Sequence, residues 1–287
     1  ASCLVGSEMC IRDSSYTDYK GLIANIRSYA VFDYLKAKLK GTGDNDGYVI
    51  SADVLSATQF GAPQKRMRFV VMGIRKDITD EVKLPEGKFK NGPYRTVEDA
   101  IKDLEDVAPV YNVSDDKDGI KLQEKTDLSE LAQLLRDSEI LHNHIITKTT
   151  KTAMERFRAL DQGQNFHSLS NEMKINTYTD VTRTQNTIYL RLKYDEPSGT
   201  VVNVRKSMWV HPTQDRAVSI REAARLQTFP DSFIFYGTKD KQYQQVGNAV
   251  PPIMAKAIAK KLAQQLRKAE DKFGVNQSPT VNLNEGV

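Results

Sequence analysis

The stretch that decides the fold is "FGAPQKRMRFVVMGIR", residues 60–75. Its second half, Phe69 to Ile74, is an apolar run with the length and composition of a buried sheet strand. Upstream, "GYVISADVLSA" (residues 47–57) predicts another strand that leads into a loop. Before that, helical spacing predicts a helix between Gly21 and Lys40, which a glycine-rich turn ends. Strands and a helix in this order indicate an α/β fold.

The polar residues of the same stretch form a second pattern. Gln64, Arg66 and Arg68 alternate, so in an extended segment they project from one face, while Met67 and Phe69 point to the core. Two guanidinium groups and an amide offer a donor-rich site that suits a phosphate or a base edge. The alternative is a solvated strand edge with surface arginines, which this segment taken alone slightly favours, so both interpretations stay open here.

A helix start is written into "SIREAARLQTFPDSF", residues 219–233. Ser219 and Glu222 have the spacing at which each side chain satisfies the other's exposed backbone N–H. One face of this helix is apolar, and the turn at Phe229–Asp231 ends it.

Several residues that favour turns and helix ends lie close together in "YQQVGNAVPP", residues 243–252. Gly247 and Asn248 predict a turn, and Pro252 suits the first position of a final helix because its missing N–H costs nothing there. The buried stripe of that helix is predicted to contain Ile253, Ala257, Ile258, Leu262 and Leu266. Residues 269–287 lack periodicity, so we predict a disordered tail.

Composition sets wide bounds on function. The 287 residues are 39% hydrophobic and 27% charged, which is enough for a substantial core. The net charge of +4 permits a nucleic-acid partner without demonstrating one. No apolar run matches a bilayer span and no secretory signal is evident, so we expect a cytoplasmic protein with no membrane partner. Residues 79–216 are a variable, loop-rich region, in which "NTIYLRLKYD" and "SGTVVNVR" predict strands.

Read together, the three blocks resemble the DNA (cytosine-5) methyltransferase family, through its Gln-x-Arg-x-Arg, Arg-Glu-x-x-Arg-Leu-Gln-x-Phe-Pro and Gly-Asn-x-Val motifs in the same order. The resemblance covers most of residues 21–266 and is weak through 79–180. It implies a partial doubly wound, S-adenosylmethionine-dependent α/β methyltransferase fold and a smaller, mixed target-recognition lobe. Residues 17–78 and 217–268 would form the catalytic layer, and residues 79–216 the lobe.

The resemblance also implies a reaction. A methyl group passes from S-adenosylmethionine to carbon 5 of a cytosine flipped out of double-stranded DNA, after a cysteine thiolate has added to carbon 6. Arg66 and Arg68 would lie beside the flipped base, with Arg68 contacting its carbonyl oxygen and Gln64 bracing the pocket. Gly247, Asn248 and Ala249 would lie at the methionine end of the cofactor, where Gly247 allows close approach and N–H groups of the following helix receive a carboxylate.

Other polar residues are expected to take no part in the reaction itself. Arg221, Glu222 and Arg225 are expected to be structural, because in the family their helix organises the base of the recognition lobe. The helix "KTTKTAMERFRAL" offers phosphate contacts or simply a solvated face, through Lys148, Lys151, Arg156 and Arg158. His142 and His144 have no further ligand at metal spacing, so we expect no metal.

Several family motifs are absent from the sequence. The glycine-rich cofactor turn, the Pro-Cys nucleophile loop and the Glu-Asn-Val block should precede residue 64, and none does. Cys3 and Cys10 lack the proline neighbour and the loop setting that would lower a thiol pKa. The sequence therefore predicts a fragment that lacks an N-terminal half, with residues 1–16 foreign to the family, an unpaired sheet edge and no activity of its own. Two alternatives remain: a DNA-binding subunit of a split methyltransferase, and the family's tRNA-directed branch.

Overall fold

The computed structural model describes residues 14–17, 23–26, 31–40, 47–175 and 185–273. These residues form two compact units. Of the described residues, the first unit contains those up to Leu55, Met67–Pro85 and the last helix from Ala257 onward. The second contains Ser56–Arg66 and Glu86–Lys256.

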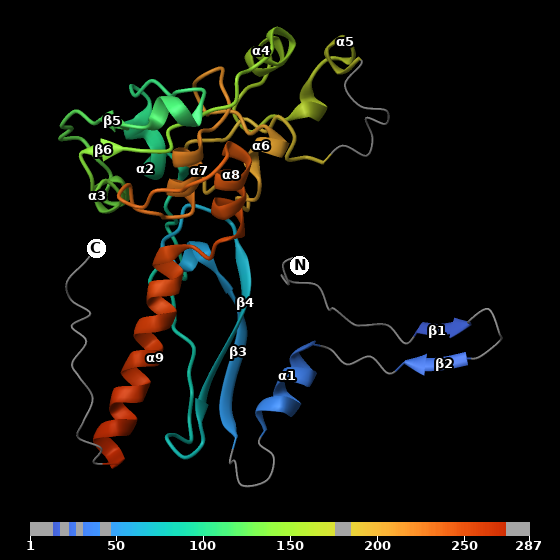
Figure 1. Cartoon of the computed structure of the whole chain (residues 1–287), viewed down its shortest axis with the longest axis vertical. Coiled ribbons are helices and arrows are strands. Elements are labelled where there is room, and N and C mark those ends of the chain that lie inside the picture. The colour runs from blue at the N-terminus through green and yellow to red at the C-terminus, as the bar shows by residue number, and fades with distance from the viewer. Residues whose placement is uncertain (1–13, 18–22, 27–30, 41–46, 176–184, 274–287) are drawn as a thin grey trace. The chain divides into compact units, whose positions relative to one another are not determined.

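Strand pairs and two helices build the first unit (Figure 1). β1 pairs antiparallel with β2 in a register that sets Ser14 opposite Ile26, and β3 pairs with β4. The elements of this unit are β1 (Ser14–Thr17), β2 (Ile23–Ile26), α1 (Val31–Leu39), β3 (Tyr48–Ser56), β4 (Met67–Arg75) and the part of α9 (Pro252–Phe273) that begins at Ala257. The predicted helix between Gly21 and Lys40 is therefore too long, because its apolar start is strand β2.

Strand β4 packs one of its faces against the last helix. Met72 and Ile74 are buried, and the partly buried Ile258, Leu262 and Leu266 of α9 pack on them, so the predicted stripe of this helix is confirmed at these positions. α9 also extends to Phe273, beyond the predicted boundary at residue 268, and the rest of the predicted tail lies outside the described residues.

The opposite face of β4 is open in this unit. Met67 and Phe69 are 45% and 41% exposed, so the prediction that they point into the core is wrong. Phe69 meets the edge of the Phe32 ring at 5.1 Å between centroids. The described strands form three two-stranded sheets, so the larger doubly wound sheet is not built by these residues alone.

Short helices around one large core make up the second unit. The core is formed by side chains of α2, α3, α7 and α8 together with Trp209. The elements are η1 (Ala57–Phe60), α2 (Val97–Ile101), η2 (Lys102–Leu104), η3 (Val113–Asp116), β5 (Ile120–Lys121), α3 (Glu130–Leu135), β6 (Ile140–Leu141), α4 (Lys151–Arg158), η4 (Phe166–Ser168), α5 (Asn171–Lys174), α6 (Val204–Ser207), α7 (Ile220–Leu226) and α8 (Lys239–Asn248).

Two strands predicted in this region do not form among the described residues. "NTIYLRLKYD" and "SGTVVNVR" make only isolated bridges, such as Arg191 with Val210 and Ser198 with Gln64. Tyr189 has a φ of 53°, which breaks an extended run, and Pro197 has no N–H to donate to a ladder. No helix in the described part of the chain is long and apolar enough to cross a bilayer.

Candidate functional site

Two glutamines, Gln64 and Gln227, connect the three sequence blocks in the second unit. The Gln64 side-chain amide donates to Gln227 Oε1 at 2.6 Å and to the Leu226 carbonyl at 3.0 Å. Gln227 in turn donates to the Val246 carbonyl at 2.8 Å, and Gln64 Oε1 accepts from the Val201 N–H at 3.1 Å. We call this set the motif junction: Gln64, Arg66, Val201, Gln227, Val246, Gly247 and Ala249.

Arg66 closes the motif junction with its guanidinium group. Nη1 donates to the Val201 carbonyl at 2.7 Å, and Nη2 donates to the carbonyls of Gly247 at 3.0 Å and Ala249 at 2.8 Å. Arg66 is 1% exposed and Gln64 is fully buried. The expectation that these two side chains jointly present donors on a strand face is wrong, because backbone groups already use those donors.

Gly247 has no room for a side chain. A Cβ built on it would lie 2.6 Å from the carbonyl carbon of Val202 and 2.7 Å from its oxygen. Its close backbone approach is therefore to Val202, in the segment that Arg66 also holds. The glycine is required by packing inside the protein, whatever binds nearby.

The predicted turn at Gly247–Asn248 is the last turn of α8, and the chain leaves the helix only at Ala249. Asn248 is exposed, whereas Gly247 is buried. The N–H groups of the next helix are occupied: Ile253 donates to Thr228 Oγ1 at 3.2 Å, and Met254 to the Pro251 carbonyl at 3.0 Å. The expectation that these groups stand open for a carboxylate is wrong.

Arg68 belongs to the first unit, on β4. It is partly exposed and its Nη1 donates to the Met67 carbonyl at 2.8 Å. Its predicted contact with the base stays a prediction, as do the roles of Gln64, Arg66, Asn248 and Ala249.

Helix α7 carries a buried ionic network. Its capping box is present as predicted, with Ser219 and Glu222 each bonded to the other's backbone N–H. Glu222 also accepts two hydrogen bonds from Arg216, at 2.8 and 2.6 Å. Arg225 is bidentate to Asp231 at 2.9 and 2.5 Å and bonds Asp103 at 2.5 Å. Their full burial confirms that the polar side chains of this helix are structural.

The pKa values of this network follow from burial and pairing. Burial alone would raise the pKa of the Glu222 carboxyl, but the charge and hydrogen bonds of Arg216 outweigh it, so this pKa lies well below its usual range. Burial lowers the pKa of Arg221 to about 10, although Asp231 opposes the shift. Burial also lowers the pKa of His211 to about 4, helped by Arg216 and opposed by Glu222.

Stability should consequently fall on mild acidification. The pKa of His211 is depressed in the folded state from its ordinary value of 6.5, so its contribution is complete above pH 6.5 and is lost as the pH falls toward 4. By pH 5 this loss amounts to about 2 kcal/mol. Buried His144, whose pKa burial also lowers, adds to it.

The measurement is urea unfolding at pH 7 and pH 5, followed by the fluorescence of Trp209, the single tryptophan, which lies in the core of the second unit. The N–H groups of Thr213 and Gln214 donate to His211 Nδ1, and the amide oxygen of His211→Asn can still accept them. In this variant, the difference in unfolding free energy between pH 7 and pH 5 should shrink by about 2 kcal/mol. An unchanged difference would show that His211 is not the titrating group.

The cationic helix α4 only partly matches its predicted role. Lys148, Lys151 and Arg158 are exposed and fit phosphate contacts. Arg156 is 8% exposed and its Nε donates to the Met173 carbonyl at 2.8 Å, so that residue is wrong as a phosphate contact. The sequence predicted a cationic helix, but it did not show that Arg156 is buried while the neighbouring cations are exposed.

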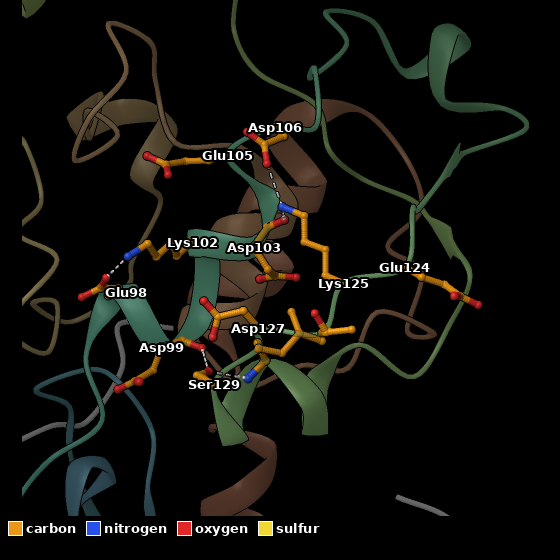
Figure 2. A pocket seen from close by; sticks show the side chains of 13 residues that line it. Glu98, Asp99, Lys102, Asp103, Glu105, Asp106, Glu124, Lys125, Asp127 and Ser129 are labelled. Carbon is orange, nitrogen blue, oxygen red and sulfur yellow. Dashed lines mark hydrogen bonds and ion pairs between the residues drawn. The ribbon is translucent and has the colours of Figure 1, made fainter.

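An acidic pocket of about 660 Å³ lies between α2, η2 and the segment before α3 (Figure 2). Lys125 bonds Asp106 at 2.8 Å and Lys102 is paired with Glu98, but carboxylates outnumber these lysines. The excess negative charge makes this pocket unsuitable for a nucleic-acid backbone.

The histidines of the described residues hold other partners. His144 Nε2 lies 3.0 Å from the Val107 carbonyl and Nδ1 lies 3.0 Å from Ser219 Oγ. No group of three or more potential metal ligands occurs among the residues that the structure describes.

Two residues of the site were missed by sequence reasoning. Gln227 links the first block to the third, and Thr228, at a φ of 67°, caps α9. Both residues lie within the Arg-Leu-Gln-x-Phe-Pro motif, so the motif indicated their positions. It did not indicate which groups their side chains would bond.

Comparison with known proteins addresses the family. The model of the family "C-5 cytosine-specific DNA methylase" matches residues 23–264. The type II methyltransferase M.DdeI of Desulfomicrobium norvegicum is 28% identical over 244 residues, 80% of this chain and 58% of that protein. M1.HphI of Haemophilus parahaemolyticus is 32% identical over 213 residues, 74% of this chain and 47% of that protein.

One solved structure shares the fold. A prophage-encoded E. coli protein described as a DNA modification methyltransferase superimposes with a TM-score of 0.58 at 24% identity, covering 77% of this chain and 61% of that one. The chain spans about half to three fifths of the length of the curated relatives named above. With the family match extending over most of the described residues, the chain belongs to the C-5 cytosine-specific DNA methylases.

Proposed function

We propose that this chain is the C-terminal part of a DNA cytosine-5 methyltransferase of the restriction–modification type, acting on a cytosine flipped out of duplex DNA. The observation that carries the proposal is the motif junction. Three family motifs separated by up to 183 residues are joined there by direct hydrogen bonds. Such convergence is typical of a functional site that one fold positions from several segments.

The residues present fit one end of S-adenosylmethionine. Asn248 is exposed beside the rigid motif junction and offers an amide donor and acceptor, and the neighbouring Ala249 is held through its carbonyl by Arg66. The methyl group comes from this cofactor when it is bound. Because the first amides of α9 are already used, the Asn248 side chain is the group that would hold the polar methionine end.

Arg66 and Gln64 act on this site by positioning. Arg66 donates to the carbonyls of Gly247 and Ala249, on either side of Asn248, and Gln64 acts through Gln227, which donates to the Val246 carbonyl. Arg68, a permanent cation with a planar donor fork, stays our candidate for the contact with a base carbonyl oxygen.

The nucleophile would come from a separate N-terminal half. Neither cysteine of this chain lies in the described residues, and neither has the sequence context of the family's nucleophile loop. The exposed apolar side chains on β3 and β4, including Tyr48, Val54, Met67 and Phe69, support the packing of a further layer of structure there.

The test is transfer of tritiated methyl groups by the chain, by a separately expressed N-terminal half, and by their mixture. We expect transfer to duplex DNA from the mixture alone, with no turnover by the chain. Transfer to tRNA in preference to duplex DNA would move the assignment to the RNA-directed branch. A mixture that forms a complex yet methylates neither substrate would contradict the proposed function.

A further inference from the structure

A second pocket of the second unit has the opposite charge to the acidic one. It encloses about 460 Å³ and lies where the segment before α4 meets the start of α8. Its lining contains three cations and one aromatic ring: Lys148, Arg216, Lys239 and Tyr111. We call it the Lys148–Lys239 pocket.

The charge of this pocket is not neutralised from within. No aspartate or glutamate lines it among the described residues, and Arg216 is already bidentate to Glu222. In the part of the chain that the structure describes, Lys148 has no ion-pair partner, and Lys239 donates to the Tyr111 carbonyl at 2.7 Å, which leaves its charge uncompensated. The ammonium groups of Lys148 and Lys239 thus belong to the lining of the same pocket.

The apolar part of the lining complements these charges. Tyr111 is 49% exposed, Met154 is half-buried and Ile146 forms a buried floor. An aromatic ring beside two lysines matches the alternation of sugar or base with phosphate along a nucleic-acid strand. A free small anion would use the lysines but would leave the Tyr111 ring without a role.

We infer that the Lys148–Lys239 pocket binds the backbone of the DNA substrate, with Lys148 and Lys239 on phosphates and Tyr111 against the adjoining nucleoside. This inference rests on the proposed function, since it adds a contact to the same substrate. It assigns Lys239, which follows the α7 motif, to the DNA surface together with Lys148 of the region predicted to read DNA. The acidic pocket takes no part in it.

Salt dependence of binding tests this assignment. Each phosphate contact contributes about 0.9 to the slope of log K against log salt, so Lys148→Ala/Lys239→Ala should lower the slope by about 2. The probe is a fluorescent duplex oligonucleotide titrated with the full chain over a range of salt concentrations. We expect at least a roughly tenfold weaker affinity for this variant at low salt.

Two matched variants make the result specific. Lys148→Arg/Lys239→Arg keeps both charges and should keep the slope, even if the alanine variant folds poorly. Lys102→Ala/Lys125→Ala removes two lysines from the acidic pocket and should also leave the slope unchanged. Trp209 fluorescence establishes that each variant is folded.

The outcomes separate this inference from the proposed function. A wild-type slope in the folded Lys148→Ala/Lys239→Ala variant overturns the pocket assignment and leaves the proposed function standing. Absence of any salt-dependent duplex binding by the wild-type chain overturns the pocket assignment and counts against DNA as the substrate. If Lys148→Ala/Lys239→Ala lowers the salt slope for duplex RNA but not for duplex DNA, the pocket binds RNA and our inference is overturned.

Discussion

Glu222→Gln should lower the free energy of unfolding of the second unit by about 3–5 kcal/mol, because it leaves the guanidinium of Arg216 buried without its partner. The substitution also turns one accepting oxygen into a donor that faces another donor. The N–H of Ser219, which donates to Glu222 at 2.8 Å, is affected as well. Urea unfolding followed by Trp209 fluorescence measures the change.

The matched control is Glu196→Gln, which removes the same charge from an exposed pair. Glu196 accepts from Lys65 at 3.0 Å, and both side chains are largely solvated. Such pairs contribute at most about 1 kcal/mol. Equal losses for the two variants would contradict the view that burial of Glu222 makes its pair important.

The second large effect is expected for Gly247→Ala. Inside a helix this change ordinarily stabilises by about 1 kcal/mol. Here the added Cβ would lie 2.6 Å from the backbone of Val202, so we expect a net loss of about 2–3 kcal/mol instead. Urea unfolding measures the stability, and methyl transfer by the reconstituted mixture should fall with it because the motif junction is displaced.

Gly199→Ala is the control for this prediction. The nearest atom to a Cβ at Gly199 belongs to the Trp209 ring, 3.9 Å away, which is an ordinary contact. This variant should lose little stability. A stabilised Gly247→Ala variant would show that the close approach to Val202 is not maintained in solution.

Local features of the fold were predictable from the sequence. The capping box of α7 depends on residues three apart, and the stripe of α9 on spacing within one helix, so both are confirmed. The helix predicted before residue 40 failed at β2, because apolar spacing over so few residues fits a strand equally well.

Long-range partners were beyond sequence reasoning. Gln64 and Gln227 are 163 positions apart, and nothing in either motif says that their amides bond each other. Arg66 was expected to present a cation, yet its guanidinium serves three backbone carbonyls that only the folded chain assembles. Exposure of Phe69 was likewise hidden, since an apolar run does not reveal which strands are present to cover it.

The most direct test of the proposed methyl transfer is the identity of the methylated nucleoside. The chain is mixed with its proposed N-terminal half, S-adenosylmethionine and duplex DNA, and the digested product is analysed by mass spectrometry. We predict 5-methyldeoxycytidine from the mixture and none from the chain alone. Formation of this nucleoside by the chain alone, or of a base methylated on nitrogen by the mixture, would contradict the proposed division of the enzyme and its reaction.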